Sequence, residues 1–370
     1  MFRKKIQWYV KFFIQRIFIL IYGKIKTPHS NYRNNDEFAY IKDIKSDTFP
    51  NRQYFLYKIK NGRIYTDTNQ TVSIINKDNI ISEASFQHVD NKLKNTNFNS
   101  ALTKGTPKFK KKFNGTVFNL TQGGSGNNYF HFIFDIIPKI YLLKKNLPIE
   151  IIDYFYVPEI KSWQKKIYLL FDINEKKLID SKKYRHIEGD LIIAVSHPWY
   201  FKEDFQNETK NIPEWIIRHN RNKFLPLIKK FNNNTKVFLD RSSSNFNHCQ
   251  IKNNNEVTEF FKKRGFTIYN SEKLSIQEQI YLFNQASIVA GAHGAAFTNI
   301  IFCKPTTQII EIIPESHPSK KCERISTILK LNYFRIKTID NNLNKSFPDT
   351  IFLTKKNLKE ISDITDLYWF

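Results

Sequence analysis

Cysteine is scarce in this 370-residue chain, and the three that occur, Cys249, Cys303 and Cys322, have neither an even number nor a C-x-x-C spacing. This excludes a disulfide framework and a structural zinc site of the usual kind, and it favours a reducing cytoplasm. Long apolar runs are missing too, because the longest uncharged stretch near the N-terminus covers only residues 17–23. A bilayer-spanning helix needs roughly 20 apolar residues, so we expect no membrane span there.

Acidic residues are few relative to basic ones. The chain has 58 Lys and Arg against 34 Asp and Glu, which gives a formal net charge of +24. Such a charge predicts attraction to nucleic acid, anionic lipid or a phosphate-bearing substrate. The drift of an AT-rich genome is a second explanation for the excess of Lys, Asn and Ile. A hydrophobic fraction of 41% with 33 Phe and 18 Tyr excludes a disordered chain and supplies core for two domains.

The sequence begins with a basic, aromatic segment, residues 1–28. No small-x-small cleavage site follows its apolar part, which argues against a signal peptide. We expect a basic amphipathic helix in the membrane interface, peripheral on the inner face of the cytoplasmic membrane. The alternative is the first helix of the N-terminal domain. We expect Trp8, Phe12, Phe13, Phe18 and Leu20 to insert, and Arg3, Lys4, Lys5, Lys11 and Arg16 to meet anionic headgroups.

Residues 29–225 read as a first domain. Short strand-like runs occur at 54–57 and 71–75, between polar turns. Residues 121–145 combine a glycine-rich loop with apolar positions at helical spacing, and Pro138 predicts a kink or stop in that helix.

Residues 226–370 are more regular and read as a second domain. Ser275 and Glu278 have the spacing of a capping box at the start of one helix. Alternation of strands and helices predicts an α/β fold with a parallel, doubly wound sheet, whose ligands bind at the carboxyl ends of strands. The expected strands are 236–240, 266–269, 287–290 and 308–313, and the expected helices are 255–264 and 275–286.

Two stretches at strand ends could hold an anion. G-A-H-G-A-A-F-T-N at 291–299 follows a strand and opens a helix, whose free N–H groups favour an anion beside His293. The alternative is a tightly packed turn with a capped histidine. Arg241 directly follows the strand at 236–240, where its guanidinium can reach a diphosphate. The alternative for that stretch, taken alone, is a solvated loop.

Two further patterns involve carboxylates. His131 and Asp135 lie four residues apart on one helical face, which suits a general base oriented by a carboxylate. The alternative is a buried histidine bonded to its neighbour. Glu311 stands inside an apolar strand, where a carboxylate is costly to bury without a partner. We expect it to bond a ligand hydroxyl or to pair with a lysine.

Taken together, these motifs resemble glycosyltransferase family 61. The matching segments are N-Y-F-H-F-I-F-D at 128–135, the Arg-x-Ser loop at 237–243, N-N-N-E-V at 253–257, S-I-Q-E-Q-I at 275–280, the glycine-alanine motif at 291–299 and I-I-E-I-I-P at 309–314. The resemblance implies a GT-B architecture, with two Rossmann-like domains facing across a cleft, and inversion at the anomeric carbon. Residues 29–225 would then form the acceptor-side domain, and residues 226–370 would bind the nucleotide-sugar. It also implies a nucleotide-sugar donor, with a UDP-sugar favoured, and no obligatory metal or other cofactor. The absence of any D-x-D triplet agrees with the last point.

The resemblance also assigns roles to residues. It implies that Arg241, with Ser242, and the backbone of Gly294, Ala295 and Ala296 hold the donor diphosphate. His293 would line the donor pocket with Asn299, and Glu311 would lie near the nucleotide ribose. His131 and Asp135 would activate the acceptor. Further donor or acceptor contacts are expected from Asn128, His248 and Lys252.

The chain departs from the family at one place. Members commonly carry arginines just before the Asn of an N-E-x-E-[VL] segment, whereas this chain has Cys249 and Gln250 before Asn253. Asn254 replaces the first Glu of that segment. Phosphate binding would then rest on Arg241, His248 or Lys252.

We therefore expect an inverting glycosyltransferase that acts on a cell-surface glycan or lipid-linked acceptor, as in capsule or lipopolysaccharide synthesis. Two alternatives stay open, a nucleic-acid-binding protein and a catalytically inactive scaffold with the same fold. Scattered lysines argue against the first, and we expect no nucleic acid partner. An α/β-hydrolase is disfavoured, because Asn127 stands where the second glycine of G-x-S-x-G belongs.

Overall fold

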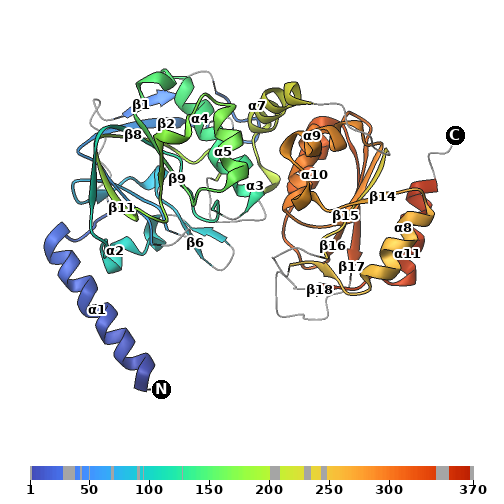
Figure 1. Cartoon of the computed structure of the whole chain (residues 1–370), viewed down its shortest axis with the longest axis horizontal. Helices are drawn as coiled ribbons and strands as arrows, with labels where there is room; N and C mark the ends of the chain where they lie inside the picture. Colours follow the sequence, from blue (N-terminus) through green and yellow to red (C-terminus); the bar gives the residue numbers. More distant parts are fainter. Residues whose placement is uncertain are drawn as a thin grey trace. The chain divides into compact units, whose positions relative to one another are not determined.

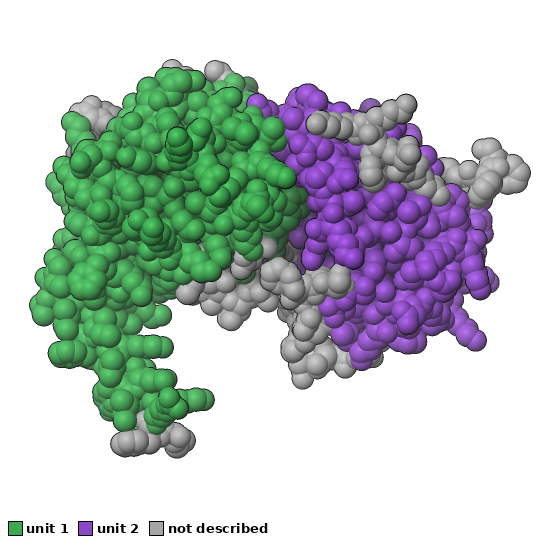
Figure 2. Space-filling model, in the orientation of Figure 1, with its two compact units in different colours: residues 1–204 green, residues 205–370 purple. Residues whose placement is uncertain are grey.

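The computed structural model describes residues 2–27, 38–41, 44–49, 51–67, 71–89, 92–94, 96–126, 128–200, 209–228, 235–242, 248–338 and 350–366. Within them the chain forms two compact units, Met1–Asp204 and Phe205–Phe370 (Figure 2). Helix α7 (Glu214–Phe224) groups with the second unit, because Arg221 donates to the carbonyl oxygens of Ile301 and Cys303. The predicted domain boundary, after residue 225, instead assigns this helix to the first domain.

Unit 1 is built on a nine-stranded mixed sheet. Four neighbouring strands are parallel: β10 (Leu178–Asp180), β9 (Tyr154–Val157), β8 (Lys111–Asn119) and β11 (His186–Val195). The others are antiparallel: β1 (Phe38–Ile41), β2 (Tyr54–Lys60), β3 (Arg63–Tyr65), β4 (Ser73–Asn76) and β5 (Asn79–Ile80). The expectation of a Rossmann-like first domain is thus wrong for the antiparallel half of this sheet.

Two strand ends position the functional part of unit 1. Strands β8 and β11 are parallel neighbours. Their carboxyl ends therefore release loops 120–128 and 196–200 at the same edge of the sheet. The first loop leads into α3 (Tyr129–His131), a π-helical turn η3 (Phe132–Ile136) and α4 (Ile137–Lys144).

Pro138 is accommodated in this helix. It occupies the first turn of α4, directly after the π-helical turn. Proline has no N–H to donate to the preceding turn, and a π turn absorbs such a break in the hydrogen-bond ladder. At the position of the predicted kink or stop, the helix therefore changes its pitch. The π-helical turn begins at Phe132, so His131 precedes its start and Asp135 lies within it.

Smaller elements complete the unit. They are helices α2 (Ala101–Lys104) and α5 (Ser162–Leu169), the hairpin β6 (Gln87–Val89) and β7 (Lys92–Lys94), and single 3-10 turns at 82–84, 96–98, 149–151 and 175–177. The core beneath the sheet is largely isoleucine and valine, including Ile64, Ile74, Val117 and Ile192.

Unit 2 has a five-stranded parallel sheet, which confirms the predicted strand direction. Its strands are β12 (Lys236–Leu239), β14 (Thr267–Tyr269), β15 (Ile288–Ala292), β16 (Gln308–Pro314) and β17 (Asn332–Thr338). Their spatial order is β14-β12-β15-β16-β17, so the chain reverses its direction of progress between β12 and β15. The carboxyl ends of these two strands form a topological switch point, where open α/β sheets bind ligands.

Helices cover both faces of this sheet (Figure 1). One face packs against α8 (Asn254–Lys263) and α11 (Lys355–Asp366), and the other carries α9 (Ile276–Gln285) and α10 (Lys321–Leu329). The predicted capping box is confirmed, because Ser275 Oγ accepts from the Glu278 N–H and Glu278 Oε2 accepts from the Ser275 N–H. The remaining elements are the 3-10 helix η8 (Ala295–Phe302), 3-10 turns at 225–227 and 271–273, and the pair β13 (Gln250–Ile251) and β18 (Thr350–Ile351).

The N-terminal helix α1 (Phe2–Tyr22) belongs to unit 1. Phe18, expected to insert in a membrane, instead packs on Phe109 with 8% of its surface exposed. Among the described residues, no helix is both long enough and apolar enough to cross a bilayer.

Candidate functional site

The switch point of unit 2 brings two predicted residues together. Strand β12 ends next to β15, with Leu239 paired to Gly291. A side chain at Gly291 would put Cβ 2.9 Å from the Leu239 carbonyl oxygen, so only glycine allows this approach. Arg241 follows β12, and its Nη1 donates to the carbonyl oxygen of His293, which follows β15.

Gly294 is also required to be glycine, for a reason different from that at Gly291. A Cβ at this position would overlap the Arg241 guanidinium. The glycine therefore makes room for Arg241 beside the first turn of η8, and Ala295 and Ala296 begin that turn half-buried. Arg241, the Gly294 backbone and the free N–H groups of this turn converge on one place, which suits a bound anion.

A buried carboxylate orients His293. Glu311 Oε1 lies 2.5 Å from Nδ1 of His293, and Glu311 Oε2 accepts from the Tyr333 hydroxyl at 2.6 Å. Glu311 thus bonds a histidine and a tyrosine. Because Nδ1 donates to the carboxylate, Nε2 of His293 is the unprotonated nitrogen. Burial and the nearby Lys321 hold the pKa of His293 well below its usual value, so the ring is neutral.

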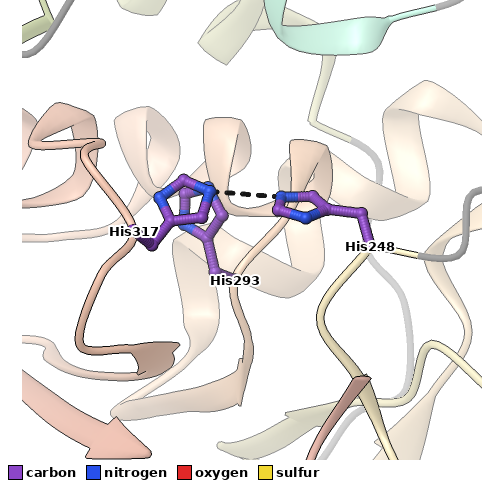
Figure 3. A group of neighbouring side chains, drawn as sticks. All are labelled: His248, His293 and His317. Atoms are coloured by element: carbon purple, nitrogen blue, oxygen red, sulfur yellow. Dashed lines mark hydrogen bonds between the residues drawn. The ribbon is translucent and has the colours of Figure 1, made fainter. Parts of the chain in front are cut away.

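His248, His293 and His317 form a cluster beside this carboxylate (Figure 3). Each offers one ring nitrogen, and these atoms lie within 4.8 Å of one another, a spacing that could hold a transition-metal ion. The pattern of hydrogen bonds opposes that use. His317 Nδ1 accepts from the Ser319 N–H at 3.2 Å, so its Nε2 carries a proton and donates to His248 Nε2 at 3.3 Å. A metal would have to displace that proton.

The charges around the cluster also favour an anion. Lys321 is buried and donates from Nζ to the Gly294 carbonyl oxygen at 3.0 Å, and Arg335 donates to the carbonyl oxygens of Ser319 and His317. Burial lowers the pKa of Lys321 and that of Arg241, because each cation is removed from water. A phosphate would stabilise both charges, whereas a metal ion would be repelled by them.

A second candidate site lies in unit 1, where the loops after β8 and β11 meet. Asp135 is fully buried, and its Oδ2 lies 2.8 Å from Nδ1 of His131. Its Oδ1 accepts from Trp199 Nε1 at 2.6 Å. The Nδ1–H of His131 therefore donates to Asp135, and in the neutral ring this tautomer leaves Nε2 without a proton, as a general base requires. Gly124 of the glycine-rich loop has φ +82° and lies against the rings of His131 and His88.

The profile of the family described as Glycosyltransferase 61 matches residues 129–310 of this chain. That span contains His131, Asp135, Arg241 and the glycine-alanine motif at 291–299. The chain belongs to glycosyltransferase family 61.

Two solved structures are similar to this glycosyltransferase at low identity. The bacterial iron-containing dodecameric glycosyltransferase TibC from enterotoxigenic E. coli H10407 is 12% identical, with 78% of this chain and 81% of that chain covered and a TM-score of 0.29. The dodecameric iron-containing heptosyltransferase TibC in complex with ADP-D-beta-D-heptose is 13% identical, with 79% and 82% covered and a TM-score of 0.27. Scores in this range do not establish a shared arrangement of domains. A comparison with curated protein sequences finds no match.

Several residues predicted for the site of this glycosyltransferase have local structural contacts. Asn128 caps α3 by accepting from the N–H groups of Phe130 and His131. Ser242 bonds Asp240 through both its backbone N–H and its hydroxyl. Asn299 is buried and donates to Gln279 at 2.7 Å, which ties η8 to α9, and Lys252 is exposed. Residues 243–247 of the loop after Ser242 lie outside the described residues.

Sequence reasoning missed the residues that support the two sites. In unit 1 these are Trp199 on Asp135, the buried Lys139, and Arg52, which holds the 197–200 loop through three carbonyl oxygens. Burial lowers the pKa of Lys139 to about 7, with Asp135 opposing the shift. In unit 2 they are Lys321, Tyr333 and His317. The sequence signal for Trp199 is its place shortly after the apolar run at 191–195.

Proposed function

We propose that this glycosyltransferase moves a sugar from a nucleotide-sugar donor to a hydroxyl of a glycan or lipid-linked glycan acceptor, with inversion at the anomeric carbon. The proposal includes a UDP-sugar as the favoured donor, a GT-B arrangement, and no required metal. An acceptor of the capsule or lipopolysaccharide type fits the family resemblance. The observation that carries the proposal is the convergence of Arg241, Lys321 and the first turn of η8 at the switch point of unit 2.

The donor end of the reaction needs positive charge. As the bond between the anomeric carbon and the phosphate oxygen breaks, the nucleoside diphosphate leaves with additional negative charge. Arg241, Lys321 and the N–H groups at the start of η8 supply fixed positive charge and donors for it. This arrangement performs the task that a metal ion performs in other transferases, which supports the expectation that none is required.

His293 has a defined part in this step. In the free protein it is neutral, and its Nε2 has no proton to donate to a phosphate. A diphosphate beside Nε2 favours the imidazolium, whose Nδ1–H remains bonded to Glu311. Donor binding then takes up one proton, and the new Nε2–H donates to the departing oxygen. Glu311 acts by positioning His293 and by stabilising its charged form.

The acceptor end needs a base, and His131 supplies it. Its Nε2 takes the proton of the acceptor hydroxyl as that oxygen forms a bond to the anomeric carbon. Asp135 stabilises the resulting imidazolium and keeps the ring in the required tautomer, with Trp199 fixing the other carboxylate oxygen.

A screen of UDP-, GDP- and CMP-sugars tests the proposal by thermal shift and by slow hydrolysis of the donor. We expect one nucleotide class to raise the unfolding temperature and to be hydrolysed slowly without added acceptor. No binding at millimolar concentration would contradict it. Retention of DNA that depends on salt and survives loss of Arg241, together with no nucleotide-sugar turnover, would favour a nucleic-acid-binding protein.

A further inference from the structure

Helix α1 carries an apolar face that no described residue covers. Ile6, Val10, Phe13, Ile17 and Leu20 follow one another at alternating intervals of four and three residues, which places them on one side of the helix. All are exposed, Phe13 by 67% and Leu20 by 87%. Exposed apolar surface of this extent on one element marks a site of interaction with a membrane or a protein.

The opposite side of α1 fixes the helix to unit 1. Phe18 packs on Phe109 with ring centroids 5.1 Å apart, and a Cβ at Gly105 would overlap Ile19. The Tyr22 hydroxyl accepts from the Lys110 N–H at 3.1 Å. Since the last turns are fixed in this way, the apolar face is directed away from unit 1.

Charge on α1 is of one sign. The helix contains Arg3, Lys4, Lys5, Lys11 and Arg16 and no acidic residue. Lys4 and Lys11 precede Phe18 at intervals of seven, so they lie on its side of the helix, opposite the apolar face. Further exposed lysines surround the attached end of the helix: Lys24, Lys26, Lys104 and Lys108.

We infer that α1 docks flat on an anionic lipid bilayer, with its apolar face in the boundary between headgroups and acyl chains and its lysines against lipid phosphates. A flat position follows from Lys11 and Arg16, which would lie in the hydrocarbon if the helix crossed the bilayer. Tyr9, exposed by 63%, lies at the edge of the face, three residues after Ile6 and four before Phe13, and tyrosine rings favour the membrane interface. This inference goes beyond glycosyl transfer, because it holds whatever the donor and acceptor are.

A second copy of the chain is the competing occupant of this face. Intervals of four and three also suit a two-stranded coiled coil. Pairing two copies of α1 through this face would place Arg16, which follows Phe13 by three residues and precedes Leu20 by four, beside the partner helix, with no acidic residue on the helix to offset its charge. Anionic lipid supplies the opposite charge that a second copy lacks, and this decides between the two.

Cosedimentation of the full chain with lipid vesicles tests the inference. We expect binding to phosphatidylcholine vesicles containing phosphatidylglycerol, and at least tenfold weaker binding to pure phosphatidylcholine. The Lys4→Gln/Lys11→Gln variant should bind the anionic vesicles about 30-fold more weakly, at about fivefold per charge. Phe13→Ser/Leu20→Ser should lose binding at least tenfold. The matched control is Leu169→Ser, which removes a leucine that is 65% exposed on α5 and should bind as wild type does.

Three results would overturn the inference. One is undiminished vesicle binding by Phe13→Ser/Leu20→Ser, and another is equal binding of the wild type to anionic and neutral vesicles. The third is a lipid-free dimer in sedimentation equilibrium that Phe13→Ser/Leu20→Ser dissociates, which would assign the face to a second copy. Nucleotide-sugar binding by the same variants should equal that of the wild type, so a failure here is distinct from a failure of the proposed transfer.

Discussion

Replacing Asp135 by asparagine reverses the hydrogen bonding of the candidate base. The side chain keeps its volume in a fully buried position, and its carbonyl oxygen can still accept from Trp199 Nε1, now 2.6 Å from Oδ1. Its amide nitrogen then faces Nδ1 of His131 in place of an oxygen at 2.8 Å. An amide donates at that position, so Nδ1 must accept and Nε2 must carry the proton. His131 can then no longer act as a base, and the negative charge of Asp135 that stabilises its imidazolium is lost.

We expect Asp135→Asn to lower the rate of transfer by about 10²- to 10⁴-fold, the usual contribution of a positioned base. Donor affinity should stay unchanged, because the donor residues belong to unit 2. Trp199→Phe is the comparison variant, since it removes one hydrogen bond to the carboxylate but leaves the charge. It should cost about 0.5 to 1.5 kcal/mol of transition-state stabilisation, roughly a tenfold loss or less. The assay is single-turnover transfer with saturating donor, and full activity in a folded Asp135→Asn protein would refute the assignment.

Three more predictions concern the switch point and the buried histidines. Gly294→Ala should weaken donor binding at least tenfold in calorimetry while the fold is retained, because the added Cβ displaces the Arg241 guanidinium; wild-type affinity would contradict this. Donor binding should take up about one proton at pH 7.5, which calorimetry detects as a binding enthalpy that depends on the buffer. Glu311→Gln should abolish this proton uptake, and uptake near zero in the wild type would exclude protonation of His293. Acid should destabilise the fold, because burial lowers the pKa of several histidines below the ordinary 6.5, so the unfolded chain binds more protons than the folded one as pH falls through that value. Each of these histidines should lower the free energy of unfolding by about 1.3 kcal/mol between pH 7.5 and 5.5, which urea unfolding measures. A constant urea midpoint would show that the histidines are protonated in the folded protein. These histidines are His186, whose pKa falls to about 4, His197, His293 and His317.

The parallel sheet of unit 2 could be predicted because its signals are local. Each strand is a short apolar run, each helix has its own period, and Ser275 with Glu278 marks a helix start within four residues. Unit 1 could not be predicted to the same degree. Its strands β3, β4 and β5 have only two to four residues, and a strand's sequence does not state whether its neighbour runs parallel or antiparallel.

The residues of the two candidate sites could likewise be predicted only where their signal is local. His131 with Asp135 could be predicted from a four-residue spacing, and Arg241 with His293 from their places after strands. Trp199 reaches Asp135 across 64 positions and Tyr333 reaches Glu311 across 22, so the topology alone brings these pairs together. The signal for such partners lies in strand order and not in any local pattern.

Lys321 and Lys320 offer a matched pair for the donor site. Lys321 is buried and bonded to Gly294, whereas its neighbour Lys320 is half-buried, with its side chain 43% exposed and paired with Glu323 at 3.3 Å. The two substitutions Lys321→Gln and Lys320→Gln remove the same charge one residue apart, so they separate a specific contact from a general loss of positive charge.

The central claim is that the donor diphosphate binds at the switch point between β12 and β15. The dissociation constant of the nucleoside diphosphate for the wild type, Lys321→Gln and Lys320→Gln tests it most directly. A hydrogen bond to a charged group contributes about 1.5 to 3 kcal/mol, so Lys321→Gln should weaken binding roughly 10- to 100-fold, with Lys320→Gln close to wild type. Equal dissociation constants for all three proteins would contradict the claim.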